Sequence, residues 1–148
     1  MDIKKILRDQ EGSRLIVYDD FNGKEIVPGY VVIGHPTIGV GRALDTNGIS
    51  LEEEDFLLEN DLKRIGVSIN SNLTWINDLD EPRKNVIRIM VFNLGMNGFL
   101  KFKRMIIALQ QKDFDRAASE MLSSQWSFQV KKRAVILAEV MRSGVWPE

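Results

Sequence analysis

Hydrophobic residues follow two periodicities along this chain, one that is typical of helices and one that alternates between successive residues, as in strands. Three apolar residues at the spacing of one helical face lie between Asp2, a plausible N-cap, and Gly12, a plausible helix stop. They predict a helix over residues 3–11. Residues 14–18 and 37–41 are rich in β-forming side chains, and they predict two short strands of a small antiparallel sheet.

Residues 21–36 connect these two predicted strands. The Asn-Gly pair at 22–23 is a strong hairpin signal, and residues 24–27 and 30–33 have the composition of two extended arms. Pro28 lies between the arms and has no N–H to donate to a strand ladder. We therefore expect an edge strand or a bulged hairpin in this connection.

The remainder of the chain is periodic at helical spacing. Ser50 and Glu53 have the spacing of a capping box, and the apolar stripe that follows them predicts one helix of roughly 20 residues. Asp80 is a further predicted cap, and the helix after it is apolar nearly all round, so it belongs in the middle of a bundle. The apolar part of that helix covers residues 86–95, and three further helices are expected over residues 99–109, 113–122 and 130–141.

These elements predict an α+β fold in a single domain, residues 1–148, which is long enough to bury a core. A small antiparallel sheet forms one lobe, residues 12–50. The long helix, residues 51–70, joins it to a mainly helical lobe made of residues 1–11 and 71–148. A cleft between the two lobes is a natural place for a polymer to bind.

Composition narrows the possible functions. The chain has no cysteine and one histidine, so we expect no disulfide framework and no metal site, and no cofactor is implied. The net charge of −1 argues against nucleic-acid binding. No secretion signal and no run of ~20 apolar residues is present, which predicts a cytoplasmic origin without stable membrane association. A basic cluster, Lys101, Lys103 and Arg104, is either a solvated face or a contact for an anionic polymer such as a cell wall.

Three polar side chains lie at the ends of predicted elements. Glu11 ends the first helix, Asp20 follows the first strand, and Thr37 opens the second. Glycoside hydrolysis needs two carboxyl groups across a sugar, one protonated and one ionised. Each residue also has an ordinary reading, as a helix-end carboxylate, a turn residue and a strand residue. Strand alternation puts Asp19 and Asp20 on opposite faces, so only one of them is expected to face a cleft.

The pattern Glu-Gly-x-Arg-Leu-x-x-Tyr-x-Asp over residues 11–20, followed by Thr-Ile-Gly-x-Gly, resembles the phage-type lysozymes. The similarity continues in order through LLENDLKR at 57–64, RIMVFNLG at 88–95, LQQK at 109–112, SSQW at 123–126 and RSGVW at 142–146. The resemblance implies a lysozyme-like fold. It also implies a monomer that hydrolyses the β-1,4 bond between N-acetylmuramic acid and N-acetylglucosamine in peptidoglycan.

The resemblance further assigns roles to particular residues. Glu11 would be the general acid, and Asp20 would be the partner carboxylate of an inverting reaction, with Thr37 helping to hold a water. Phe92 taken alone is more simply a core residue than a sugar platform, and Asn93 needs a hydrogen-bond partner. The implied substrate contacts are Gly41, Phe92, Asn93 and Arg133, the last lying close to Glu11.

Two departures from the family pattern lead to hypotheses. The connection at residues 21–36 is far longer than usual, and we expect it to narrow or gate the cleft, with Glu25 as a fallback carboxylate if it folds inward. Arg42 stands where a family histidine is expected, and Asp61 stands at the position of that histidine's carboxylate partner. We therefore predict an Arg42–Asp61 ion pair.

The resemblance also implies an endolysin that accumulates in the host bacterial cytoplasm and reaches the wall through a separate pore-forming protein. Two other functions stay open. A lytic transglycosylase would need only Glu11 and would leave an anhydro-sugar end. A non-catalytic peptidoglycan-binding module on the same fold would have no need of Glu11, Asp20 and Thr37 together.

Overall fold

The first helix forms where the sequence predicts it. In the computed structural model, which describes residues 1–148, α1 spans Ile3–Glu11. The side chain of Asp2 accepts a hydrogen bond from the Lys4 N–H at 3.0 Å, which satisfies one free donor of the first turn. Gly12 ends the helix with φ +83°, a conformation that glycine adopts without a steric penalty. Glu11 is therefore held at a well-defined helix end.

The sheet contains three antiparallel strands in the order β1-β2-β3, and a short helix follows them. The bounds are β1 (Arg14–Asp19), β2 (Pro36–Gly39), β3 (Arg42–Ala43) and α2 (Leu44–Asn47). Tyr18 pairs with Thr37, and Asp19 pairs with Pro36. Residues 37–41 were expected to form the last strand, but the chain turns after Gly39 and adds β3. The sheet brings the end of β1 beside the start of β2.

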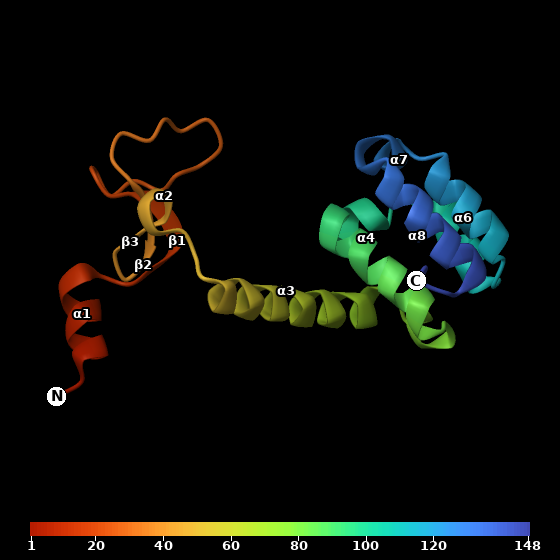
Figure 1. Cartoon of the computed structure of the whole chain (residues 1–148), viewed down its shortest axis with the longest axis horizontal. Coiled ribbons are helices and arrows are strands. Elements are labelled where there is room, and N and C mark those ends of the chain that lie inside the picture. Colours follow the sequence, from red (N-terminus) through yellow and green to blue (C-terminus); the bar gives the residue numbers. More distant parts are fainter. The chain divides into compact units, whose positions relative to one another are not determined.

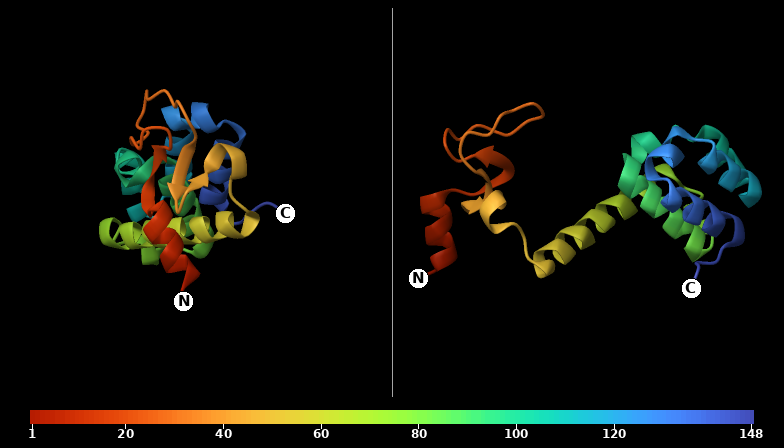
Figure 2. Two further views of the ribbon diagram at one scale, coloured as in Figure 1. Left: turned by 90° about the vertical axis from the view of Figure 1, so that its left-hand side faces the viewer. Right: turned by 45° about the horizontal axis from the view of Figure 1, so that its top comes forward.

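The connection between β1 and β2 differs from the prediction. Residues 24–27 and 30–33 are not strands, and a single bridge between Tyr18 and Glu25 joins the connection to the sheet. The N–H of Ile33 donates to the Asp19 carboxylate instead of to a strand ladder. Figures 1 and 2 show the connection in orange as a long loop beyond the strand ends.

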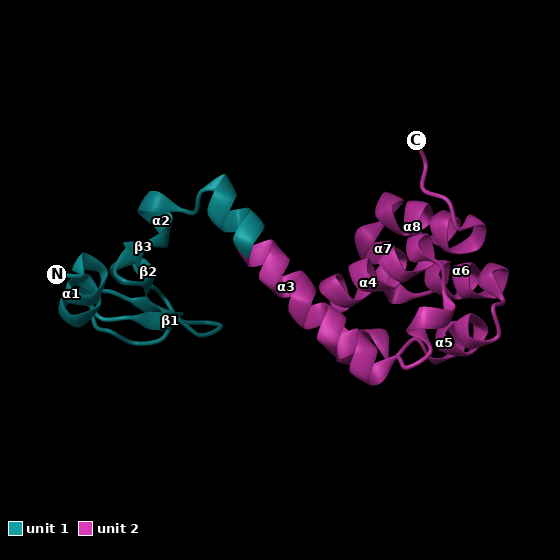
Figure 3. Cartoon of the chain, turned by 90° about the horizontal axis from the view of Figure 1, so that it is seen from below, with its two compact units in different colours: residues 1–56 teal, residues 57–148 magenta.

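The long helix α3 spans Leu51–Asn72 and begins with the predicted capping box. The Glu53 N–H donates to Ser50 Oγ at 3.1 Å, and the Ser50 N–H donates to Glu53 Oε1 at 3.0 Å. The chain divides into two compact units, residues 1–56 and 57–148, so α3 begins in the first unit and ends in the second (Figure 3). The expected cleft between the lobes, and the packing of residues 1–11 on the helical lobe, stay predictions.

The second unit is entirely helical. After α3 it contains η1 (Ile76–Asp78), α4 (Glu81–Phe99), α5 (Lys103–Gln110), α6 (Phe114–Leu122), α7 (Gln125–Val130) and α8 (Lys132–Ser143). The sequence pattern missed α7, which is too short for a helical periodicity to appear. Helix α8 packs against α4, α6 and α7. With the small antiparallel sheet, this confirms the predicted α+β fold class.

The hydrophobic core lies within this helical unit. Met90, Met105, Met121 and Met141 come from four different helices, and all are fully buried. Trp126 is buried, whereas Trp146, near the end of the chain, is 37% exposed. No helix in the structure is long and apolar enough to cross a bilayer.

The predicted Arg42–Asp61 ion pair would join the two units, so it stays a prediction, and each of its residues has a partner within its own unit. Arg42 donates to Glu53 in the first turn of α3, and Asp61 pairs with Arg64 one turn further along the same helix. Asp61 and Arg64 are three residues apart on one helix, a spacing that makes their side chains neighbours. The hydrogen bond from Arg42, followed by those from Ser50, lowers the pKa of Glu53 from 4.5 to about 2.

Replacing Glu53 by glutamine should therefore destabilise the protein in a pH-dependent way. Glutamine can still complete the capping box, so the substitution mainly removes the charge. The pKa is depressed on folding, so the stabilisation is complete above pH 4.5 and is lost as the pH falls to about 2. Thermal unfolding of the wild type and of Glu53→Gln between pH 7 and 2 measures the gap between their stabilities. Glu54→Gln, an exposed glutamate of the same turn, is the control, and a gap that stayed constant down to pH 2 would contradict the expectation.

Candidate functional site

Glu11 and Gly41 lie beside each other in the first unit. Glu11 is exposed at the end of α1, and Gly41 lies in the turn between β2 and β3 with φ +68°. A Cβ placed on Gly41 would lie 3.5 Å from Glu11 Oε2. The absence of a side chain at Gly41 therefore leaves space directly against one face of the Glu11 carboxyl group.

Asp20 and Thr37 are held together by the backbone of His35. The Asp20 N–H donates to the His35 carbonyl oxygen at 3.1 Å, and Thr37 Oγ1 donates to the same oxygen at 2.9 Å. The His35 N–H donates in turn to Asp20 Oδ1 at 2.6 Å. Three hydrogen bonds thus fix a carboxylate and a hydroxyl at the junction of β1 and β2.

The two members of this pair differ in exposure. Asp20 is exposed, whereas Thr37 is only 3% exposed. The Thr37 hydroxyl donates its proton to the His35 carbonyl oxygen. A water molecule could therefore bind Thr37 Oγ1 only by donating a hydrogen bond to it. The neighbouring Asp19 is fully buried, which confirms that only one of the two successive aspartates faces outward.

His35 is the one histidine of the chain, and its ring has a partner. His35 Nδ1 lies 2.8 Å from Asp45 Oδ2, and the hydrogen bond that the ring donates to the Asp45 carboxylate raises the pKa of His35 above 6.5. This pair joins the end of the connection to α2. No local sequence signal indicates it, because the two residues belong to a loop and a short helix that only the sheet brings together.

The other candidate residues belong to the second unit. Trp126 Nε1 donates to Asn93 Oδ1 at 2.9 Å, which supplies the partner that Asn93 requires. Asn93, Trp126 and Arg133 line one small pocket of about 30 Å³. Phe92 is 51% exposed, so its interpretation as a core residue is wrong. Phe92 instead lines a larger apolar pocket of about 520 Å³ together with Ile89.

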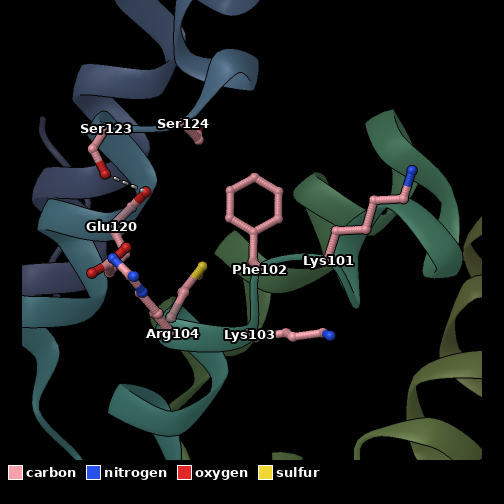
Figure 4. A pocket seen from close by; sticks show the side chains of 8 residues that line it. Lys101, Phe102, Lys103, Arg104, Glu120, Ser123 and Ser124 are labelled. Atoms are coloured by element: carbon pink, nitrogen blue, oxygen red, sulfur yellow. Dashed lines mark hydrogen bonds between the residues drawn. The ribbon is translucent and has the colours of Figure 1, made fainter.

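The predicted basic cluster surrounds a third pocket, of about 490 Å³. Its lining includes Lys101, Lys103 and Arg104, none of which forms an ion pair. Figure 4 shows the ring of Phe102 standing between Lys101 and the side of the pocket formed by the turn between α6 and α7. The pocket combines positive charge with an aromatic surface, which suits an anionic ligand that also carries apolar groups.

The site residues thus fall into two sets. The first unit contains Glu11, Asp20, Thr37 and Gly41, and the second contains Phe92, Asn93 and Arg133. No group of three histidine, cysteine or acidic side chains is placed to hold a metal ion. The sequence pattern missed the contribution of the His35 backbone, which orients both members of the Asp20–Thr37 pair.

Replacing Gly41 by alanine tests the space beside Glu11. Gly39→Ala is a matched control, because Gly39 has φ +70° and an added Cβ would meet nothing within 4 Å. Both variants should lose stability by ~1 kcal/mol from backbone strain. Only Gly41→Ala should also lose glycosidase activity, since its methyl group would occupy the space against Glu11. Equal activities of the two variants, measured at equal folded fractions, would show that this space is not used.

Comparison with known proteins identifies the family of this chain. The family model described as phage lysozyme matches residues 8–141, and the chain belongs to that family. It is 30% identical over 164 residues to probable T4-type lysozyme 1 of Dictyostelium discoideum, covering 96% of this chain and 94% of that protein. It is 27% identical to probable T4-type lysozyme 2 of the same organism, covering 99% of this chain and 96% of that protein. It is 28% identical to the pre-baseplate central spike protein Gp5 of Enterobacteria phage T4, covering 97% of this chain and 28% of that protein.

Proposed function

We propose that this chain is a muramidase, which hydrolyses the β-1,4 bond between N-acetylmuramic acid and N-acetylglucosamine in peptidoglycan. Membership of the phage lysozyme family supports the reaction class. The main structural support is the pairing of Asp20 with Thr37 through the His35 carbonyl. The Asp20 N–H and the Thr37 hydroxyl share the His35 carbonyl oxygen, and the His35 N–H binds the exposed Asp20 carboxylate, so a carboxylate and a hydroxyl oxygen are both available for the orientation of a single water molecule.

In the proposed reaction the two carboxyl groups have opposite protonation states. Glu11 is protonated and donates its proton to the leaving oxygen, and Asp20 is ionised and accepts a proton from the attacking water. Thr37 Oγ1 accepts the second hydrogen bond from that water, because its own proton is used by His35. Both hydrogens of the water are then directed at the protein, and an oxygen lone pair faces the sugar. Attack on the face opposite the leaving group inverts the anomeric carbon.

The remaining candidates would bind and orient the substrate. Gly41 lets the sugar approach Glu11 closely, and Arg133 would orient the Glu11 carboxyl group. Asn93 uses its oxygen for Trp126, so its Nδ2 group is the part that could donate to an N-acetyl carbonyl. We assign Phe92, which is half exposed, to an apolar contact with the sugar. The proposed reaction uses no cofactor.

The proposed biological role is that of an endolysin. The protein would act as a monomer, would stay in the host bacterial cytoplasm until it is released to the wall, and would then cause cell lysis. The basic cluster around Phe102 would favour the acidic peptidoglycan polymer.

The test is a digest of purified peptidoglycan by the wild type and by Glu11→Gln, followed by reduction and identification of the new ends by mass. The wild type should produce reducing muramic acid ends, and Glu11→Gln should produce none, because an amide cannot donate the required proton. Circular dichroism should show that both proteins are folded. Anhydro-muramic ends would identify a lytic transglycosylase. A folded wild type that binds peptidoglycan but produces no ends would identify a binding module.

A further inference from the structure

A buried carboxylate lies next to the proposed catalytic Asp20. Asp19 ends β1, and its side chain is 0% exposed. In the first unit only Asp19 and Thr37 are buried. A buried carboxylate is costly unless all of its oxygen lone pairs find donors. The positions of those donors show which segment Asp19 holds in place.

All the donors to Asp19 come from the connection at residues 21–36. Oδ1 accepts from the N–H groups of Phe21 and Gly34, each at 3.0 Å, and Oδ2 accepts from the N–H of Ile33 at 2.8 Å and the hydroxyl of Tyr30 at 2.9 Å. The Tyr30 oxygen accepts in turn from Asn22 Nδ2 at 2.8 Å. The Asp19 carboxylate therefore binds both the start and the end of the connection to the end of β1.

The charge of this anchor persists over a wide pH range. Burial raises the pKa of Asp19, but the hydrogen bonds, led by the one from Ile33, outweigh this effect and bring the pKa from 3.8 to about 2. Asp19 is therefore ionised throughout the neutral and mildly acidic range. An ionised acceptor makes stronger hydrogen bonds than a neutral one, so the connection is held firmly.

The segment held by Asp19 is also the segment that contacts Asp20. His35 follows Gly34 directly, and it bonds Asp20 through both its N–H and its carbonyl oxygen. Gly34 lies so close that an added Cβ would overlap Asp20 Oδ1 and would lie 3.0 Å from Asp19 Oδ1. Only glycine allows the backbone to approach both carboxylates at once.

We propose that Asp19 is a positioning residue, which anchors residues 33–35 so that the His35 N–H fixes the Asp20 carboxylate. The inference rests on the proposed function, in which Asp20 accepts a proton from the attacking water. A displacement of a reacting group by ~1 Å can cost ~10²-fold in rate, so an anchor of this kind affects catalysis without contact with substrate. The long connection thereby supports the catalytic carboxylate as well as any gating role.

The first test compares Asp19→Asn with a matched Asp55→Asn control. Asp55 is an exposed aspartate near the start of α3, just after its first turn. Asp19→Asn should lower kcat by ~10–100-fold and leave KM unchanged, because it disturbs the Asp20 carboxylate and not the sugar contacts. Asp55→Asn should keep both values. Combined with Asp20→Asn, Asp19→Asn should cause no further loss of kcat, because Asp19 acts through Asp20.

The second test does not depend on activity. In ¹⁵N-labelled wild type, the His35 amide signal should shift as the Asp20 carboxyl group is protonated, and this shift should be absent in Asp20→Asn. It should also be lost in Asp19→Asn and in Gly34→Ala, but should be kept in Asp55→Asn. Gly34→Ala retains the Asp19 carboxylate, and its Cβ would meet Asp20 Oδ1 as well as Asp19 Oδ1, so it tests whether residues 33–35 must stay in place if Asp19→Asn folds poorly.

The outcomes separate this inference from the proposed function. An unchanged kcat in folded Asp19→Asn, an additive loss in the double variant, or a retained His35 shift in both Asp19→Asn and Gly34→Ala overturns the positioning role. A wild type that cleaves no peptidoglycan overturns the proposed function. The amide shift then still decides whether Asp19 holds Asp20: its loss supports that contact and its retention overturns it.

Discussion

Replacing Asp20 by asparagine is expected to lower kcat for peptidoglycan hydrolysis by about 10²–10⁴-fold. Asparagine has the same shape, and its oxygen can still accept the hydrogen bond from the His35 N–H. It has no negative charge, so it cannot accept a proton from the attacking water. Measurement of kcat and KM on soluble glycan fragments should therefore show a loss confined to kcat.

The control for this prediction is Thr37→Ser. Serine keeps the hydroxyl that donates to His35, so folding and the orientation of the water should be retained, with at most a several-fold change in rate. Wild-type activity in Asp20→Asn would contradict the assignment of Asp20. If that activity also left anhydro-sugar ends, the protein would be a transglycosylase that relies on Glu11 alone.

The second large effect concerns stability. Phe99 is fully buried at the end of α4, and its ring stacks on Phe102 with the centroids 6.4 Å apart. Phe99→Ala should lower the free energy of unfolding by ~3–5 kcal/mol, because it removes a large apolar surface and leaves a cavity. That loss is a large part of the ~5–15 kcal/mol by which a typical domain is stable. Urea unfolding followed by tryptophan fluorescence measures it.

Phe128→Ala provides the matched comparison for Phe99→Ala. Phe128 lies in α7 and is 78% exposed, so its truncation removes little buried surface. The expected change in unfolding free energy is within ~0.5 kcal/mol. Similar losses for the two variants would contradict the location of the core at Phe99.

Helix ends were predictable because their causes are local. The Asp2 cap, the Gly12 stop and the Ser50–Glu53 capping box each involve side chains within a few residues of the backbone groups they satisfy. The same locality explains why α7 was missed, since six residues are too few to show a periodicity. Arg42, by contrast, pairs with Glu53, 11 positions further along the chain, which no local pattern indicates.

The candidate site was predictable in its residue types and only partly in its arrangement. The alternation of side chains along a strand correctly separates the buried Asp19 from the exposed Asp20. The predicted arm at residues 30–33 failed for a non-local reason. Its composition suits a strand, but the N–H groups of Ile33 and of the following Gly34 are used by a carboxylate 14 and 15 positions earlier in the chain.

The sequence by itself determined the longer helices, the first two strands of the small sheet, the family and the exposed aspartate, because period, caps and short motifs encode local preferences. Only the tertiary structure decided that Asp19 organises the long connection, and that His35 joins Asp20 to Thr37 through its backbone. The physical reason is that a buried carboxylate accepts from any donor the fold brings near it, whatever the distance along the chain. Such contacts depend on where the strand ends meet, and no local pattern records that.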